Sequence, residues 1–412
     1  MLSENTQTEQ AEALMRAFAS RTGLDDGHPV RRYLWTDAFA VCNLLGLAAE
    51  TGREEYAVLA LRLIDQVHET LGRFRPDDAR TGWISGMGED EGRARPTAAG
   101  LRIGKPLPER GEGEPYDGRL EWKRDGQYFH YLAKWMHALD SASRRTGDPR
   151  YAGWACELVS AAGKAFVYVS SSGHMGMYWK MSVDLSRPLV ESMGQHDPLD
   201  GYLTAHQLLE TSGKMPVTSR EDDVGGCAGI GEWAGLYAEM VRGRAWGTTD
   251  VLGLGGLLSS ATHLAQLIGR GASPHRDLLL ELLHAAEYGI YRWNRSGILE
   301  HQAEDRLAFR ELGLAIGLES VRWMREAAEE KGEYLVEGND FEENLKSLDG
   351  YVPLGRRIIS FWLEPENRST ANWLEHEDIN SVMLATALAP GGFMLLPGLE
   401  TAAAGLRGGG GQ

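Results

Sequence analysis

Apolar positions recur along this chain at the three-to-four-residue spacing of helices that each bury one face. The clearest runs, at 34–50 and 127–144, are each followed by a Thr-Gly pair, three residues, a tyrosine and a second run with helical spacing. The matching stretches read TGREEYAVLALRLIDQV at 51–67 and TGDPRYAGWACELVSAA at 146–162. The pattern predicts two copies of a unit made of a helix, a Thr-Gly turn and a second helix.

The residues between the helices of each copy suit a helix end and a helix start. Gly52 and Gly147 stand where a helix C-terminus favours a left-handed residue, and Pro149 suits a first helical turn. Strand-like alternation is rare, and KAFVYVSS at 164–171 is interpreted as the end of an outer helix. Further helices are expected at about 199–211, 228–242, 253–269, 275–293, 305–329, 340–361 and 376–388.

Repeated helical hairpins predict a repeat architecture, which can be an open solenoid or a closed toroid. Irregular spacing and long Gly/Pro-rich insertions at 73–120, 171–198 and 212–227 favour a closed toroid with functional loops. We expect one domain over residues 1–404, with a rim or lid loop near 73–120. The Gly-rich tail at 405–412 is expected to be flexible.

Charge and composition narrow the range of partners and locations. The net charge of −17 argues against nucleic acid and against anionic membrane surfaces. We expect no membrane span, because no run of about 18 apolar residues occurs, and the polar N-terminus does not resemble a signal peptide. Cys42, Cys156 and Cys227 are too widely spaced for a disulfide framework or a zinc motif, so each is expected to be a small buried side chain. We expect a cytoplasmic protein and make no prediction of its oligomeric state.

Acids stand beside histidine or aromatic residues where several of the predicted helices begin. A helix start explains one acid, because its free N–H groups and dipole favour negative charge, but it does not explain the rings. The segments are YLWTDAF (33–39), EWKRDGQYFHY (121–131), GQHDPLDGY (194–202), SREDDVGGCAGIGEW (219–233), EHQAEDRLAF (300–309) and WLEHEDINS (373–381).

In a closed toroid the starts of the inner helices converge on one mouth, so these side chains are expected around one cavity. Such a cleft suits sugar chemistry. A protonated carboxyl can donate to a leaving oxygen while a second carboxylate activates water or stabilises positive charge. The 12 tryptophans add flat apolar rings that match the C–H face of a pyranose, although many must be core side chains.

The run LWTDAFAVCNLLGLAAETGREEYAVLA (34–60) resembles a segment of the unsaturated glucuronyl and rhamnogalacturonyl hydrolases. Their segment reads Leu-Trp-x-Asp, an apolar helix, Thr-Gly-Asp-x-x-Tyr and a second helix. The TGDPRY hairpin at 146–151 is similar to the wider six-hairpin group, which also includes N-acylglucosamine 2-epimerases and arabinofuranosidases. The resemblance implies an all-α (α/α)6 toroid, with Asp37 as general acid/base and Trp35 beside it.

We therefore predict a carbohydrate-active enzyme, and the favoured hypothesis is a glycoside hydrolase. Its catalytic residues would be Asp37 with Glu121 or Asp125, although Asp37 also suits a plain helix-start acid. The substrate-binding candidates are Trp35, Trp122, Gln127, Tyr128, His130, Tyr131, His174, Tyr178, His196, Asp197, Asp200, Glu232, Trp233, Trp373, Glu375 and His376. The expected partner is a small-molecule or oligosaccharide substrate.

Two alternatives stay open. A sugar epimerase or isomerase in the same toroid would, as the resemblance implies, use paired histidines, with His130, His196 and His376 as candidates. The other is a non-catalytic glycan-binding protein or one adapted to specialised small-molecule metabolism. No metal or other cofactor is expected, because a zinc HExxH motif would need a second histidine where Asn380 stands.

Overall fold

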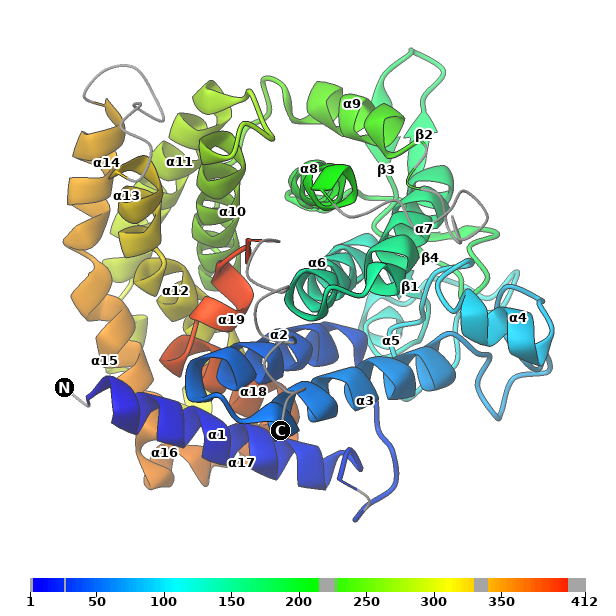
Figure 1. Ribbon diagram of the computed structural model, residues 1–412, viewed down its shortest axis with the longest axis horizontal. Coiled ribbons are helices and arrows are strands. Elements are labelled where there is room, and N and C mark those ends of the chain that lie inside the picture. Colours follow the sequence, from blue (N-terminus) through cyan, green and yellow to red (C-terminus); the bar gives the residue numbers. More distant parts are fainter. Residues whose placement is uncertain (1–2, 26, 215–226, 228, 330–339, 399–412) are drawn as a thin grey trace, which may run out of the picture. The chain divides into compact units, whose positions relative to one another are not determined.

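The computed structural model describes residues 3–25, 27–214, 227, 229–329 and 340–398, and helices make up most of it (Figure 1). It divides into two compact units. The α6 unit comprises residues 29–45, 57–242 and 397–412, and the α10 unit comprises residues 1–28, 46–56 and 243–396. The expected single domain stays a prediction, and the predicted flexible tail and the acidic run Glu221–Asp223 lie outside the described residues.

Both predicted Thr-Gly hairpins are present. The first joins α2 (Leu34–Thr51) to α3 (Glu54–Leu71), and the second joins α6 (Phe129–Thr146) to α7 (Pro149–Phe166). Gly52 and Gly147 have φ values of 68° and 73°, the left-handed conformation that ends a helix without a side-chain clash. Local sequence signals therefore placed both turns correctly.

The α6 unit is a packed group of helices with two small sheets. Here α6 packs on α7 and on α8 (Asp197–Lys214), and α8 packs on α9 (Ile230–Val241) (Figure 1). The short helices α4 (Glu89–Ala94) and α5 (Gly118–Glu121) lie in the long 73–120 segment. One antiparallel sheet joins β1 (Gln127–Tyr128), β4 (Lys180–Met181) and β5 (Pro188–Val190), and the other joins β2 (Val167–Val169) and β3 (Met175–Met177).

The expectation for 164–171 was wrong in part. Helix α7 ends at Phe166, and the next three residues form β2, which pairs with 175–177. The β-branched Val167 and Val169 favour an extended backbone where a partner strand is available.

The α10 unit is built around α10 (Val251–Gly269), which packs on α11 (Arg276–Asn294), α12 (Ala308–Glu319) and α13 (Val321–Glu329). In this unit α12 also packs on α15 (Val352–Leu363) and α18 (Glu377–Leu388), and α18 packs on α1 (Glu4–Arg21). Its other elements are α14 (Asp340–Asp349), α16 (Pro365–Arg368), α17 (Ala371–Glu375), α19 (Gly391–Met394), η1 (Ile298–Glu300) and η2 (Ala303–Asp305).

Two features of this unit differ in detail from the predictions made from the sequence. The predicted helices at 305–329 and 340–361 are each divided in two, at Ser320 and at 350–351. Helix α10 is long and apolar enough to cross a membrane, but 83% of its apolar window is buried within the fold. That degree of burial is typical of a core helix.

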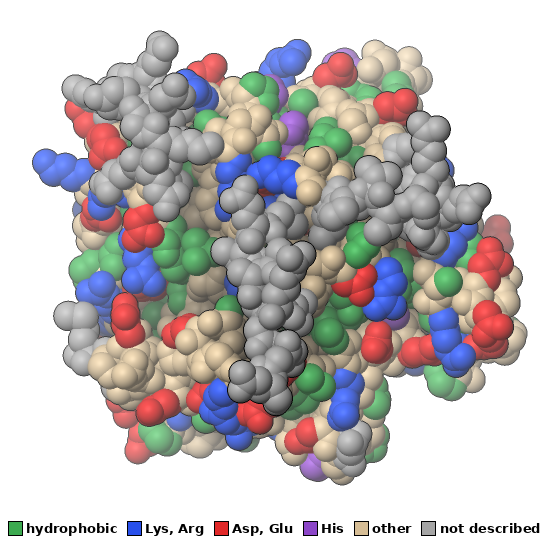
Figure 2. All heavy atoms as spheres, in the orientation of Figure 1, with side chains coloured by type: hydrophobic (Ala, Val, Ile, Leu, Met, Phe, Trp, Pro, Cys, Tyr) green, Lys and Arg blue, Asp and Glu red, His purple; other side chains and the backbone are tan. Residues whose placement is uncertain are grey.

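Charged side chains are also balanced locally at the surface. Figure 2 shows acidic and basic side chains side by side around α4, where Arg73 pairs with Glu89 and Arg93 pairs with Glu69. Such exposed pairs contribute only about 0–1 kcal/mol each. They bring opposite charges together on a protein of strongly negative net charge.

The expectation for two of the cysteines was wrong. Cys156 in α7 and Cys227, just before α9, form a disulfide with a Cα–Cα distance of 5.2 Å. Sequence spacing did not reveal it, because the packing of α7 against α9 is what brings the two together. Cys42 is buried and free, and burial raises the pKa of its thiol to about 12. The cytoplasmic location stays a prediction; in a reducing compartment the Cys156–Cys227 pair would be held as thiols.

Removing this disulfide is expected to lower the free energy of unfolding by about 2–4 kcal/mol, because the bond restricts the unfolded chain between its two ends. The variant is Cys156→Ser with Cys227→Ser, compared with the unchanged chain by denaturant unfolding with and without reductant. Reductant should destabilise the unchanged chain and leave the double variant as it is. Equal stability of all four samples would contradict the prediction.

His68 of α3 gives a pH-dependent prediction. Its Nε2 accepts the indole N–H of Trp135 at 3.2 Å, and burial lowers its pKa to about 3. The unfolded chain takes up a proton below about pH 6.5 while native His68 stays neutral, so stability falls as the pH drops from there towards 3. Over that window the unchanged chain should lose about 1.4 kcal/mol per pH unit more than His68→Gln. Urea unfolding of both chains between about pH 7 and about pH 5 checks this, and parallel curves would refute it.

Candidate functional site

Asp37 lies in the first turn of α2 with both of its carboxylate oxygens engaged. Oδ2 accepts the backbone N–H of Tyr33 at 2.8 Å, and Oδ1 pairs with Arg32 Nη1 at 3.2 Å. The side chains of Arg32 and Asp37 are 0% and 2% exposed. These contacts fit a helix-start acid that neutralises a buried guanidinium. The catalytic role of Asp37 stays a prediction.

Glu121 and Asp125, the predicted carboxylate partners, are also bound to cations. Glu121 pairs with Lys180 Nζ at 2.8 Å and with Arg110 Nε at 3.1 Å. Asp125 is fully buried, pairs with Arg102 Nη1 at 2.8 Å and accepts the backbone N–H groups of residues 104–105 and 126. Both carboxylates therefore have the ion-pair and hydrogen-bond partners that are typical of side chains with a structural role.

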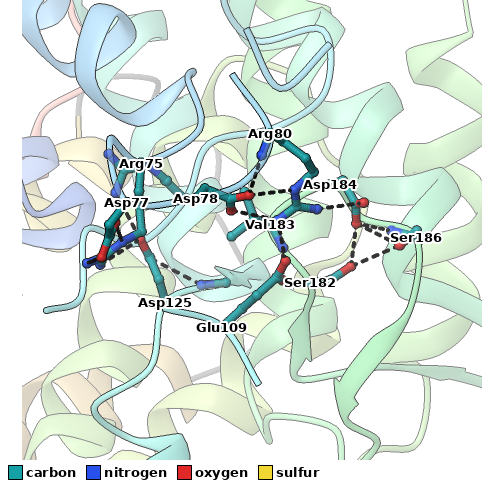
Figure 3. Close-up of polar contacts among 12 residues, drawn as sticks. Arg75, Asp77, Asp78, Arg80, Glu109, Asp125, Ser182, Val183, Asp184 and Ser186 are labelled. Atoms are coloured by element: carbon teal, nitrogen blue, oxygen red, sulfur yellow. Dashed lines mark hydrogen bonds and ion pairs between the residues drawn. The ribbon is translucent and has the colours of Figure 1, made fainter. Parts of the chain in front are cut away.

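The long 73–120 segment is fastened to the β4–β5 hairpin by polar contacts (Figure 3). The Arg80 guanidinium binds the carboxylates of Asp78, Glu109 and Asp184, and Glu109 also accepts the backbone N–H of Val183. The buried amide of Gln127 donates to Ala99 O and Val183 O and accepts from Leu101 N. These bonds are consistent with a rim loop that is held in place. The Gln127 amide makes structural hydrogen bonds within it.

A different group of predicted residues comes together where α6 meets α8. His130 Nδ1 lies 2.7 Å from Asp200 Oδ2, and Lys134 Nζ lies 2.9 Å from Asp200 Oδ1. On the other side of the imidazole, the Trp35 indole N–H donates to His130 Nε2 at 3.3 Å. The His130 side chain is 32% exposed, so it reaches the surface of the α6 unit while Asp200 stays buried.

The helix geometry explains this arrangement. His130 and Lys134 stand four residues apart on α6, so both face α8. Asp200 in the first turn of α8 accepts from both. We call these three residues and Trp35 the His130 cluster.

The charges of the cluster set the protonation of Asp200. Burial alone would raise its pKa, but the Lys134 ammonium and the His130 imidazole outweigh burial and hold the pKa well below its usual range. Asp200 is therefore a stable carboxylate, and it can accept the Nδ1–H of His130. With that proton on Nδ1, the lone pair lies on Nε2, the nitrogen that the Trp35 indole faces.

The Tyr131 ring lies beside the cluster, and the Tyr33 ring lies next to it. Tyr33 and Tyr131 share a hydrogen bond of 2.8 Å between their hydroxyls, and the Tyr131 ring is 6.1 Å from the His130 ring. Burial raises the pKa of both phenols far above neutral pH. Both are neutral groups that can donate or accept a hydrogen bond.

Asp197 lies one helical turn before Asp200 on α8 and accepts the backbone N–H of Gly194. His130, Asp197 and Asp200 each offer one ligand atom within 4.8 Å of the others, a spacing that would allow a cation. The Lys134 ammonium already neutralises Asp200, which makes a bound cation less favourable there. His196 is half-buried just before α8, one turn from Asp200.

The other predicted residues lie in other surroundings. His174 and Glu232 are exposed, Tyr178 stacks on Tyr168 at 4.5 Å, and Trp233 packs over Gly163. Trp373, Glu375 and His376 belong to the α10 unit, where Trp373 is buried against Trp362 and His376 lies 5.9 Å from Phe309. The rings of Trp122 and Tyr128 each contact the ring of Trp179.

Sequence reasoning missed Lys134, Trp179 and Lys180. Lys134 had a usable signal, because it is a lone cation four residues after His130 on an otherwise apolar stretch of helix. Trp179 and Lys180 had none, because only the pairing of β4 with β1 places them beside Tyr128.

Comparison with known proteins shows the fold and leaves the activity open. No family model matches the chain, and no curated protein matches it. A GH76A alpha-1,6-mannanase from Salegentibacter sp. HEL1_6 is similar in structure, with a TM-score of 0.50, 14% identity, and coverage of 93% of this chain and 99% of that one. A cellobiose 2-epimerase from Spirochaeta thermophila has a TM-score of 0.47 and 10% identity, with coverage of 92% of this chain and 97% of that one. A D-mannose isomerase has a TM-score of 0.46 and 11% identity, with coverage of 94% of this chain and 98% of that one.

The predicted all-α (α/α)6 toroid fold is thereby confirmed. The resemblance to unsaturated glucuronyl hydrolases stays a prediction.

Proposed function

We propose that this protein is a carbohydrate-active enzyme of the epimerase or isomerase kind, which moves a proton at a carbon next to a sugar carbonyl. The observation that carries the proposal is the His130–Asp200 pair, with a 2.7 Å contact and an imidazole that reaches the surface of its unit. A likeness in fold to an α-1,6-mannanase supports a sugar as the substrate. The choice of reaction rests on the side chains.

His130 has the environment of a general base. Asp200 holds the Nδ1–H and stabilises the imidazolium that forms when Nε2 exchanges the Trp35 indole N–H for the substrate and takes a proton. Hydrogen next to a carbonyl becomes acidic enough for such a base only if the developing negative oxygen is stabilised. The neutral hydroxyls of Tyr131, whose ring lies 6.1 Å from that of His130, and of its hydrogen-bond partner Tyr33 are the groups we assign to that oxygen.

Hydrolysis is supported less well by the same residues. A hydrolase needs one carboxyl that carries a proton and a second that is free to act on water or on the sugar. Asp37, Glu121 and Asp125 are all paired with arginine or lysine instead. An isomerase needs a single base, which returns the proton to the neighbouring carbon, whereas an epimerase also needs a group on the opposite face.

The deciding experiment is a screen of neutral reducing mono-, di- and trisaccharides in D2O, followed by NMR. We expect deuterium to replace the hydrogen next to the carbonyl and a ketose or an epimer to accumulate. Aryl glycosides and α-1,6-mannan are screened in parallel for release of sugar. Hydrolysis without exchange would replace this proposal with the hydrolase reading, and inactivity on every sugar would end it.

A further inference from the structure

Two tryptophans of the α6 unit, one exposed and one half-buried, form an aromatic shelf. Trp122, just after α5, is 54% exposed, and its ring lies 5.0 Å from that of Trp179 at an interplanar angle of 78°. Beneath them, the buried ring of Tyr128 is 5.4 Å from Trp179 and 5.1 Å from Tyr131. Tyr131 is the neighbour of His130 on α6, so the rings connect the shelf to the proposed base.

A buried ion pair fixes the backbone on which the shelf is built. Lys180 Nζ donates to Glu121 Oε1 at 2.8 Å, and also to Glu121 O at 2.8 Å and Arg124 O at 2.9 Å. These two carbonyls flank Trp122 in the sequence, and Lys180 itself follows Trp179. Burying a pair of charges costs free energy unless its geometry is good, so this pair marks a place where the backbone position is closely specified.

The three-stranded sheet positions Trp179, the second tryptophan of the shelf. Lys180 pairs with Tyr128 across β4 and β1, and its ammonium lies 5.4 Å from the centre of the Tyr128 ring. The backbone N–H of Trp179 donates to Val190 O at 3.1 Å. Trp122 and Trp179 are thus held from two directions although Trp122 is exposed.

We propose that Trp122 and Trp179 form a second saccharide site, so that the substrate is a neutral di- or oligosaccharide rather than a monosaccharide. The proposal rests on the proposed function only for its link to His130, which runs through the rings of Tyr128 and Tyr131. An exposed indole offers an apolar face to the C–H groups of a sugar ring, and the buried Lys180–Glu121 pair fixes the backbone that carries this one.

Three cations near the shelf are paired with carboxylates of the protein itself, whereas Arg119 and Lys123, on either side of Trp122 in the sequence, are exposed. Lys180 and Arg110 both pair with Glu121, and Arg124 pairs with Glu114. Burial of Lys180 and these pairings leave the three cations engaged with carboxylates of the protein itself. Recognition at the shelf is therefore assigned to ring stacking.

The test compares mono-, di- and trisaccharides of one neutral series by calorimetric binding and by turnover. The variants are Trp122→Ala and Trp122→Phe, with Tyr288→Ala as the matched control, because Tyr288 is an exposed ring in the α10 unit. We expect the unchanged chain to bind the disaccharide more tightly than the monosaccharide. Trp122→Ala should weaken disaccharide binding about tenfold and leave monosaccharide binding unchanged, as expected for loss of an aromatic anchor.

Trp122→Phe should keep most of the disaccharide affinity, and Tyr288→Ala all of it. Equal affinity for mono- and disaccharide, or a disaccharide affinity that Trp122→Ala does not change, overturns the second site even if His130-dependent turnover is found. Conversely, Trp122-dependent binding of a disaccharide without any turnover supports the site and ends the proposed reaction.

Discussion

Replacing His130 with alanine should lower kcat/KM for the sugar identified in the screen by about a thousandfold, since a positioned general base contributes about 10²–10⁴. The fold should survive, because His130 is partly exposed and its loss leaves Asp200 paired with Lys134. Unfolding curves and circular dichroism check that point. Deuterium exchange into the sugar, which reports proton removal alone, should fall by the same factor as turnover.

Asp200→Asn tests the other half of the pair. The amide keeps the size of the side chain but can present an N–H to His130 Nδ1, which favours the wrong tautomer and removes the charge that stabilises the imidazolium. A loss of about 10²–10⁴ in kcat/KM is expected. His301→Ala is the control, because His301 is an exposed histidine of the α10 unit. If His130→Ala retained full exchange, the base would have to be another residue.

The part of the fold that followed from the sequence is the part set by local signals. Helical spacing, Gly52 and Gly147 fix where helices run and where they turn, and these features act within a few residues. The β1–β4 pairing and the Cys156–Cys227 disulfide escaped prediction because they join residues more than fifty positions apart. The division of 305–329 at Ser320 was missed for a related reason, since the helical pattern continues across the break.

The candidate site was predicted in its location more than in its chemistry. His130, Tyr131 and Asp200 were chosen because acids and rings stand together at helix starts, and the structure brings them together. The catalytic carboxylates were harder to choose, because sequence shows where an acid is but not which distant cation neutralises it. Glu121 illustrates this: its partner Lys180 is separated from it by 59 residues.

Asp37→Asn should lower the free energy of unfolding by about 3–5 kcal/mol, because it removes the charge that faces a fully buried guanidinium. The asparagine can still accept the Tyr33 N–H, so the loss reports the ion pair rather than the helix start. Combining it with Arg32→Gln should recover part of the stability, since both members of the ion pair are then neutral. Glu300→Gln is the matched control, because its pair with Arg357 is exposed and worth only about 0–1 kcal/mol.

The same variant separates the two roles of Asp37. Under conditions where Asp37→Asn is folded, we expect kcat on the sugar of the screen to stay within about threefold of the unchanged chain, because general acid–base residues cost about 10²–10⁴ when removed. Urea unfolding and activity are measured on one preparation, so that the folded fraction corrects the rate. A folded Asp37→Asn that has lost turnover would restore Asp37 as the general acid, and with it the hydrolase reading. A stable and active Asp37→Asn would refute the structural role of Asp37, because breaking a buried ion pair from one side lowers stability.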